Sequence, residues 1–363
     1  MTRRVRVGVV FGGRSSEHSI SCVSAGSVLA ALDRARYDVV PIGITPEGRW
    51  VLAPDEPAAL QARDGELPSV GAGSGAGVAI PGDPSAGGLL VLDAGEGPRT
   101  LAGVDVVFPL LHGPFGEDGT IQGLLDLAGI PYVGSGVLAS AVSMDKEFMK
   151  LVLSARGLPV GDYVVLRIRD LPQAAALVEP VGWPVFVKPA RAGSSIGISK
   201  VRDAAGLDAA LRLAWQHDPK ALVEAAVAGR EIECAVLAGL EGGAPEASLP
   251  AEVRTAGEFY DFTAKYLDDT TEFDVPADLP SDVTAEVRAL ACRVFTAVDA
   301  KGLARVDFFL TPEGGLIVNE LNTMPGFTPM SMFPRMWAAT GLDYPALVDR
   351  LVRTALSEGS GLR

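Results

Sequence analysis

Two apolar runs near the C-terminus constrain the fold more than any other feature of this sequence. They cover residues 304–310 and 318–326 and are joined by a turn that contains proline and glycine, which predicts a strand hairpin. Side chains alternate along a strand with period two, so Asp307, Glu320 and Asn322 are expected on one face of the hairpin. Oxygen ligands with no nearby His or Cys suit Mg²⁺ that also binds substrate phosphates.

An arginine close to the three oxygen ligands, and a glycine- and serine-rich loop further upstream (the phosphate-type loop), also indicate a site for phosphate groups. Arg305 lies two residues before Asp307 and is expected to project to the same side. Further upstream, an apolar run ending at Lys188 leads into a loop with Gly193, Ser194 and Ser195. Small residues let backbone N–H groups approach phosphate oxygens, and a lysine adds positive charge. The alternative is an ordinary hairpin turn with an exposed lysine.

The length and the order of the segments predict several domains. A chain of 363 residues is long for one hydrophobic core. Residues 1–143 alternate strand and helix patterns, which is typical of a parallel α/β layer, and residues 54–100 read as an insertion of loops with one exposed hairpin. A second unit is expected over 144–220 and a third over 221–363. Strands are predicted at 5–11, 37–44, 89–92, 104–111, 164–167, 185–188 and 198–201, and helices at 146–155, 207–215 and 344–355. The three strands of the second unit are expected to be antiparallel and connected by hairpins.

Charge and cysteine content exclude several classes of protein. The net charge of −14 argues against a sequence-independent nucleic-acid binder, which would be basic. Cys22, Cys234 and Cys292 lack metal-ligand spacing and are expected to be reduced thiols, buried or half-buried. No uninterrupted apolar run approaches the roughly 18 residues of a membrane span. We therefore expect a cytoplasmic protein without a membrane partner.

Several further motifs have a structural alternative when each is taken alone. Glu224 and Glu231 flank an apolar linker that could hold adenosine, although a strand-to-helix corner between solvated glutamates is commoner. Glu17 follows the first strand, where open α/β sheets bind ligands, but a glutamate there also favours a helix dipole. His112 follows another strand, and its position is as compatible with a structural role as with a role in ligand binding. His18 is expected to be structural. Residues 258–266 form a polar, aromatic segment of the kind that closes over active sites.

Six motifs in order give the chain a family resemblance. They are Gly-Gly-x-Ser-x-Glu-His, Leu-His-Gly-x-x-Gly-Glu-Asp-Gly, Ser-Met-Asp-Lys, Lys-Pro-x-x-x-Gly-Ser-Ser-x-Gly, Phe-Tyr-Asp-x-x-x-Lys-Tyr and Asn-Glu-x-Asn-Thr-x-Pro-Gly. In this order the chain resembles the D-alanine–D-alanine ligases of the ATP-grasp superfamily, over nearly its whole length. The resemblance implies an α/β and α+β protein: an N-terminal doubly wound parallel α/β domain, followed by a two-subdomain ATP-grasp fold with a central lid and a C-terminal part.

The resemblance also implies a reaction and a set of site residues. ATP would phosphorylate one D-alanine, and the amine of a second would attack the D-alanyl phosphate, which supplies a dipeptide for peptidoglycan. Two Mg²⁺ (Mn²⁺ is possible) would be held by Asp307, Glu320 and Asn322. The residues implied around ATP are Lys146, Phe186, Lys188, Gly193, Ser195, Glu224, Val227, Glu231 and Phe309. Those implied around D-alanine and the reacting atoms are Glu17, His112, Ser194, Lys265, Tyr266, Arg305, Gly326, Ser331 and Met332.

Within this set the resemblance implies individual roles. Glu17, Ser194 and Tyr266 would form a hydrogen-bonded triad, in which Glu17 fixes the first D-alanine ammonium. Arg305 and the Gly326 N–H would stabilise the tetrahedral oxyanion. A homodimer is implied as well.

The alternatives are a D-alanine–D-lactate ligase, another ATP-grasp ligase, or a non-catalytic ATP-binding regulatory module. The module would need no oxyanion arginine, and a Rossmann oxidoreductase is disfavoured because the first loop lacks the dinucleotide fingerprint.

Overall fold

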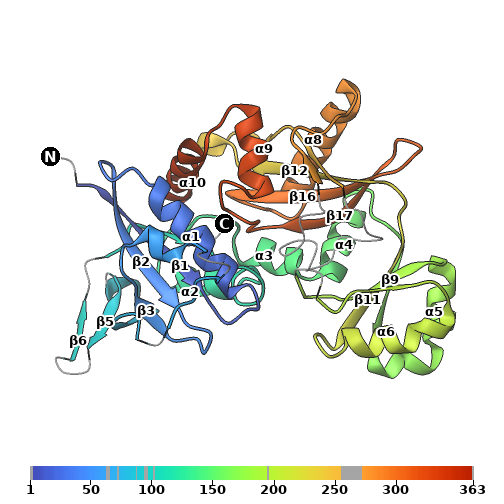
Figure 1. The fold of residues 1–363 in the computed structure, drawn as a ribbon, viewed down its shortest axis with the longest axis horizontal. Coiled ribbons are helices and arrows are strands. Elements are labelled where there is room, and N and C mark those ends of the chain that lie inside the picture. The colour runs from blue at the N-terminus through green and yellow to red at the C-terminus, as the bar shows by residue number, and fades with distance from the viewer. Residues whose placement is uncertain are drawn as a thin grey trace.

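The computed structural model describes residues 3–62, 66–71, 73–86, 88–93, 97–100, 103–193, 196–254 and 272–361. Three β-sheets of seven, four and six strands organise these residues. Figure 1 shows the N-terminal sheet in blue and cyan, the central sheet in green to yellow-green, and the C-terminal sheet in yellow to red. Short 3-10 turns η1 to η6 occupy Pro57–Leu60, Pro84–Ala86, Ile168–Gln173, Glu179–Val181, Ala204–Gly206 and Leu240–Gly242.

The N-terminal sheet has the strand order β6-β5-β4-β3-β2-β1-β7. Its parallel part comprises β1 (Val5–Gly12), β2 (Tyr37–Ile44) and β7 (Val106–Pro109). Helices α1 (His18–Ala31) and α2 (Thr120–Leu127) follow β1 and β7. This part has the expected α/β alternation, because β-branched residues fill strands that are buried on both faces.

Residues 54–100 are more regular than the sequence predicted. Besides the expected strand, now β5 (Leu90–Asp93), they contain β4 (Gly77–Ala79) and β6 (Gly97–Thr100). Together with β3 (Trp50–Leu52) these strands extend the N-terminal sheet in antiparallel pairing. The expectation of one strand was wrong because Val78 and Val91 are buried in the core of that sheet, which stabilises segments too short to show a pattern.

The central sheet is antiparallel, with the order β10-β9-β11-β8. Its strands are β8 (Tyr163–Arg167), β9 (Val185–Pro189), β10 (Ser199–Val201) and β11 (Lys220–Ala225), with helices α5 (Ala174–Val178) and α6 (Leu207–Ala214). Only β9 and β10 form the expected hairpin, because β11 lies between β8 and β9. A boundary after residue 220 would separate β11 from both partners, so the predicted boundary does not follow the sheets.

The C-terminal sheet contains the hairpin predicted from the sequence. Its order is β15-β14-β12-β16-β17, and β13 pairs with β12. The strands are β12 (Arg230–Leu237), β13 (Glu246–Ala247), β14 (Ala251–Arg254), β15 (Glu272–Asp274), β16 (Leu303–Leu310) and β17 (Leu316–Asn322). The helices are α3 (Val137–Met144), α4 (Lys146–Ala155), α8 (Ser281–Ala297), α9 (Met332–Thr340) and α10 (Tyr344–Glu358). Helix α4 begins where predicted, because the Asp145 side chain accepts the backbone N–H groups of Glu147 and Phe148.

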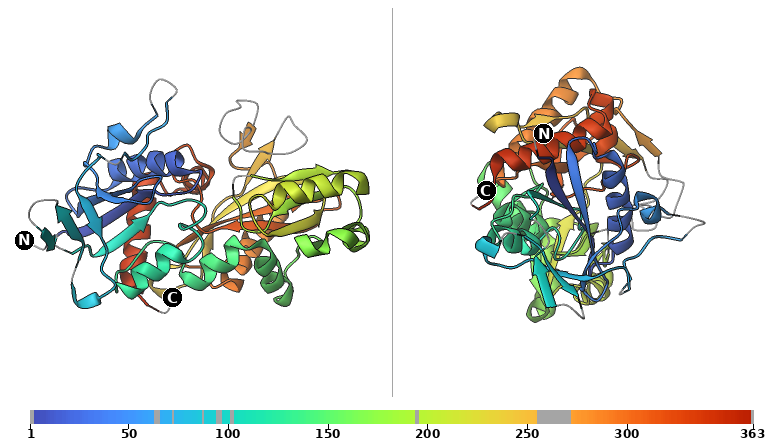
Figure 2. Two further views of the ribbon diagram at one scale, coloured as in Figure 1. Left: turned by 90° about the horizontal axis from the view of Figure 1, so that it is seen from below. Right: turned by 90° about the vertical axis from the view of Figure 1, so that its left-hand side faces the viewer.

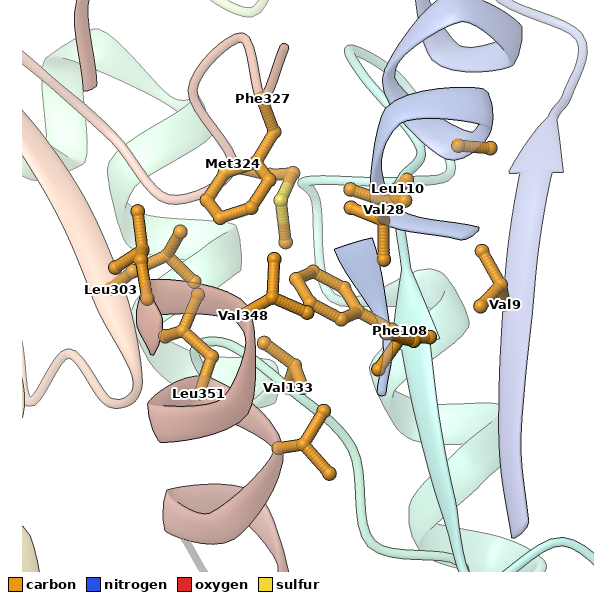
Figure 3. Close-up of a cluster of buried hydrophobic side chains, with 14 of the residues drawn as sticks. Val9, Val28, Phe108, Leu110, Val133, Leu303, Met324, Phe327, Val348 and Leu351 are labelled. Carbon is orange, nitrogen blue, oxygen red and sulfur yellow. The ribbon is translucent and has the colours of Figure 1, made fainter. Parts of the chain in front are cut away.

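One hydrophobic core joins the first sheet to the C-terminal segment. Figure 3 shows Phe108 of β7 packed near Val348 of α10, with Met324 and Phe327 above them. The Phe108 and Phe327 rings meet edge to face with centroids 5.6 Å apart, and Figure 2 shows α10, in red, alongside the blue strands. This core fixes the loop after β17 against the loop after β7.

Among the described residues, no helix is both long and apolar enough to cross a membrane.

Candidate functional site

A pocket of about 360 Å³ collects most of the predicted residues that handle the amino acid and the metal. Loops after β1 and β7 form one wall, and β17 with the following loop forms the opposite wall. The start of α4 and the first half of the loop after β9 close a third side. The predicted residues that line it are Glu17, His112, Lys146, Gly193, Arg305, Glu320, Asn322, Gly326, Ser331 and Met332.

The loop after β1 brings Glu17 into the pocket through a sharp turn. Gly12 has φ of +88°, and a Cβ there would lie 2.3 Å from the Ile44 carbonyl oxygen, so only glycine fits. His18 is structural, as predicted. Its Nδ1 donates to the Gly13 carbonyl over 2.7 Å, and its Nε2 accepts the Val70 N–H over 3.0 Å.

His112 is a buried residue of the pocket wall, and both of its ring nitrogens have a partner. Its Nδ1 donates to the Met324 carbonyl over 3.0 Å, so Nε2 is left to accept from the Ser24 hydroxyl, 3.4 Å away. Burial lowers the pKa of His112, and the nearby Glu17 charge and the Met324 carbonyl oppose that shift only in part. His112 therefore ties the N-terminal wall to the C-terminal wall of the pocket.

Glu117 is a pocket residue that the sequence reasoning missed. Its carboxylate accepts the Gly113 N–H over 2.7 Å and the Met324 N–H over 3.0 Å, so it joins the same two walls. Burial, followed by repulsion from Glu17, raises the pKa of Glu117 to about 8, although both N–H groups favour the carboxylate. Glu117 is the glutamate of the Leu-His-Gly-x-x-Gly-Glu-Asp-Gly motif, and its place in that motif could have identified it as a site residue.

The β16–β17 hairpin sets Arg305 among carboxylates. Asp307 pairs with Glu320 and Arg305 with Asn322 in the strand register, with an irregularity after Asp307. The Arg305 Nε and Nη2 each donate to an Asp307 oxygen over 2.7 Å, and Nη2 lies 3.4 Å from Glu233 Oε1. Burial alone would lower the pKa of Arg305, but Asp307 and then Glu233 raise it. The guanidinium is held rigidly at the pocket wall.

The oxygen donors of this hairpin fit a hard cation that also binds a substrate. Asn322 Nδ2 donates to Asp307 Oδ2 over 3.0 Å, which brings the predicted set together. In the described part of the chain, no group of three or more His, Cys, Asp or Glu is placed to hold a metal ion. The set contains two carboxylates and one amide, so further oxygens would have to come from triphosphate, as Mg²⁺ commonly requires.

Lys146 extends from the first turn of α4 toward this set. Its Nζ donates to the Ala192 carbonyl over 3.0 Å and lies 3.6 Å from Glu320 Oε2. Its backbone N–H donates to the Ala190 carbonyl over 3.0 Å. Helix α4 therefore fixes the beginning of the loop after β9 at the pocket. A Cβ placed on Gly193 would lie 3.5 Å from Glu17 Oε2, so this loop also approaches the N-terminal wall.

Apart from Lys146 and Gly193, the predicted nucleotide residues lie outside the pocket lining. Lys188 pairs with Glu224 Oε1, and the Lys150 Nζ lies 3.3 Å from Glu224 Oε2. In the central sheet Glu224 is directly opposite Phe186. In the C-terminal sheet Glu231 is directly opposite Phe309. Opposite residues of an antiparallel pair share a face, so each sheet presents one glutamate beside one aromatic ring.

The remaining predicted residues lie after these elements or outside the described chain. Half-buried Val227 follows β11, and its side chain would be 3.7 Å from a Cβ on Gly161. The Ser331 hydroxyl accepts the Thr328 N–H over 3.1 Å and borders Gly326. The predicted residues Ser194, Ser195, Lys265 and Tyr266 lie outside the described residues.

Two further charged residues near the site, Lys150 and Glu233, were not predicted from the sequence. Lys150 follows Lys146 by four positions on α4, so helical spacing was its signal. Glu233 follows Glu231 by two on β12, so strand alternation was its signal.

Comparisons with known proteins agree with this arrangement. A family model described as D-ala D-ala ligase N-terminus matches residues 6–135, and one described as D-ala D-ala ligase C-terminus matches residues 152–353. A D-alanine–D-alanine ligase from Mycobacterium avium (strain 104) is 58% identical, over 100% of this chain and 99% of its own. One from Nocardia farcinica is 59% identical over 100% of both chains.

Solved structures are similar over nearly the whole chain. A D-Ala:D-Ser ligase from Enterococcus faecalis has a TM-score of 0.85 and 34% identity, covering 97% of this chain and 100% of its own. The D-alanine–D-alanine ligase from Coxiella burnetii has a TM-score of 0.81 and 37% identity, covering 98% and 94%.

Proposed function

The chain belongs to the D-alanine–D-alanine ligase family, and we propose that it joins two D-alanine molecules with conversion of ATP to ADP and phosphate. The product is D-alanyl-D-alanine, a precursor for peptidoglycan. The observation that carries this proposal is the pocket between Glu17 on one wall and Arg305 with Glu320 on the other. An amino acid held between a carboxylate and a cation would present its own carboxylate to ATP.

We propose that the first step forms D-alanyl phosphate. Glu17 holds the ammonium of the first D-alanine, beside His112, and the substrate carboxylate attacks the γ-phosphorus of ATP. The bond from that phosphorus to the β,γ-bridging oxygen breaks, and ADP leaves. Lys146 and Lys188 bind the phosphates and offset their charge as it shifts.

The hairpin oxygens support metal binding during this step. Asp307, Glu320 and Asn322 would hold two Mg²⁺ ions, or Mn²⁺. Bound metal neutralises charge on the transferring phosphoryl group. Arg305 donates to both Asp307 oxygens and Asn322 donates to Oδ2, so Oδ1 keeps a lone pair with which it could bind a cation.

In the proposed second step, the amine of a second D-alanine attacks the acyl phosphate. The Ser331 hydroxyl and the Met332 N–H hold the carboxylate of that substrate. Arg305 and the Gly326 N–H stabilise the tetrahedral oxyanion. The attack forms the C–N bond, and the nitrogen loses a proton to the departing phosphate or to solvent. Collapse of the intermediate then breaks the C–O bond to phosphate and leaves the peptide bond. The triad of Glu17, Ser194 and Tyr266, with Lys265, remains a proposal from the sequence.

For the nucleotide, we propose that adenosine lies between the central and C-terminal sheets. Val227 and the linker after β11 give backbone hydrogen bonds to adenine, with Glu224 nearby. Glu231 takes ribose hydroxyls, and Phe186 and Phe309 flank the base. Gly193 and Ser195 belong to the loop proposed to cover the phosphates.

The identity of the second substrate, the acceptor, has to be chosen among D-alanine, D-serine and D-lactate. One similar structure is named for D-serine, whereas the curated relatives named here, at 58% and 59% identity, are named for D-alanine. We therefore propose D-alanine as the acceptor, with D-lactate or D-serine ligation as the alternative. We also propose a homodimer in the cytoplasm, which light scattering and fractionation would test.

An acceptor competition tests the proposed function. Purified protein with ATP and Mg²⁺ is given D-alanine alone, then D-alanine with equal D-serine or D-lactate, and products are identified by mass spectrometry. L-alanine alone serves as control. We expect ADP release only with D-alanine present and D-alanyl-D-alanine as the main product. A mixed dipeptide or ester as main product would contradict the acceptor, and no ADP release would contradict the ligase.

A further inference from the structure

Glu224 has one lysine on each carboxylate oxygen. Lys188 of β9 pairs with Oε1, and Lys150 of α4 lies 3.3 Å from Oε2. The side chain of Glu224 is 9% exposed, that of Lys188 7% and that of Lys150 3%. The three charged groups are therefore clustered and largely shielded from solvent, and the two lysines belong to different elements.

The two lysines differ in what else they can reach. Neither lysine lines the pocket, but Lys188 lies next to the end of β9, which leads into the phosphate-type loop, whereas Lys150 is one helical turn beyond Lys146. The Lys150 Nζ lies 5.5 Å from the centroid of the Tyr163 ring, which covers it from the central sheet. Lys150 is thus placed to stay with Glu224 rather than to follow a ligand.

The proposed ATP chemistry creates a conflict at this cluster. Lys188 gives up part or all of its interaction with Glu224 when it binds phosphate, and a buried carboxylate that loses its counter-ion is strongly destabilised. Burial alone would raise the pKa of Glu224, but Lys188 and then Lys150 lower it, so the group stays ionised. A second cation that remains in place removes the conflict.

We propose that Lys150 is a positioning residue for ATP binding, which holds the Glu224 carboxylate while Lys188 turns to the phosphate groups. The inference rests on the proposed role of Lys188. In this account Lys150 touches neither ATP nor D-alanine. Its effect reaches ATP through Glu224, whose carboxylate keeps one counter-ion in both states.

The test begins with the variant Lys150→Met, which keeps the volume and removes the charge. Lys188 should then be retained by Glu224, so the KM for ATP should rise about tenfold or more while kcat changes much less. The matched control is Lys301→Met. Lys301 makes an ion pair with Asp299 over 3.5 Å, away from the pocket, and its loss should leave the KM for ATP unchanged.

The second variant pair separates positioning from folding. Glu224→Gln keeps an acceptor oxygen but no charge, so Lys188 is free and Lys150 has no carboxylate to hold. The KM for ATP of Lys150→Met/Glu224→Gln should therefore equal that of Glu224→Gln, and should lie below that of Lys150→Met. The comparison of the double variant with Glu224→Gln stands even if Lys150→Met alone does not fold.

The results distinguish a positioning role of Lys150 in ATP binding from a purely structural role. A Lys150→Met protein with a lower Tm and an unchanged KM for ATP would show a structural lysine only and overturn the inference. A double variant with a KM well above that of Glu224→Gln would also overturn it. If Lys188→Ala leaves the KM for ATP and kcat unchanged, the proposed role of Lys188 fails first, and with it the premise of the inference.

Discussion

Lys220 should carry an unusually large share of the stability at the junction between α4 and the central sheet. Its Nζ lies 2.7 and 2.6 Å from the two Asp145 oxygens and 2.7 Å from Glu147 Oε2. Asp145 caps α4, and the Lys220 carbonyl accepts the Ala190 N–H. The perturbation is Lys220→Met, which leaves two carboxylates without their main cation.

The magnitude follows from burial and from the partners that remain. Removing one partner of a buried ion pair costs about 3–5 kcal/mol. Asp145 keeps two backbone N–H donors and Arg191 at 3.9 Å, and Glu147 keeps Arg167 at 3.9 Å. We therefore expect the lower end, about 3 kcal/mol, which corresponds to a fall in Tm of roughly 6 °C at about 2 °C per kcal/mol.

Thermal unfolding monitored by circular dichroism measures this shift. The control is Arg212→Met, which removes an exposed ion pair with Asp208 on α6 and should not change Tm measurably. Lys220→Met/Asp145→Asn keeps the helix cap but removes one stranded charge, so its Tm should lie above that of Lys220→Met. A fall of less than about 1 °C in Lys220→Met, or a double variant no better than the single, would refute the reasoning.

Three further outcomes are expected. Glu320→Gln should remove nearly all ligase activity and weaken Mg²⁺ dependence; most activity retained at saturating Mg²⁺ would mean that the cation binds elsewhere. Because burial lowers the pKa of His112 from 6.5, the folded state binds fewer protons there, so stability falls as pH drops below about 6.5. The Tm of wild type should thus fall more than that of His112→Gln between pH about 7.5 and about 5.5; equal falls would assign the loss to other groups. Phe327→Ala should lower the free energy of unfolding by about 3–4 kcal/mol, measured by urea denaturation, since its ring contacts Phe108 and Phe333; a change under about 1 kcal/mol would contradict that packing.

Elements with a strong local pattern were predictable from the sequence. The strand at 37–44 and the helix at 146–155 have the predicted bounds, because one is a run of apolar and β-branched residues and the other starts at an aspartate cap. The hairpin of β16 and β17 was predictable from alternation, since β16 buries every second residue along most of its length. Cys22, Cys234 and Cys292 are buried or half-buried free thiols, as expected.

Features that depend on pairing between distant segments were not predictable. The three-residue strand β4 exists because it pairs with β3 and β5, and no local period marks it. The position of β11 between β8 and β9 is likewise a matter of pairing. Lys150 and Glu233 follow the periodicity of their helix and strand, but each opposes another buried charge, Glu224 and Arg305 respectively, and that pairing is defined only in three dimensions.

The most direct test of the account follows oxygen from D-alanine to phosphate. D-alanine with both carboxylate oxygens replaced by ¹⁸O is incubated with ATP, Mg²⁺ and the protein, and the released phosphate is analysed by mass spectrometry. If the carboxylate attacks the γ-phosphorus, one ¹⁸O must appear in each phosphate released with the dipeptide. Dipeptide formation with unlabelled phosphate would contradict activation of D-alanine through an acyl phosphate at this site.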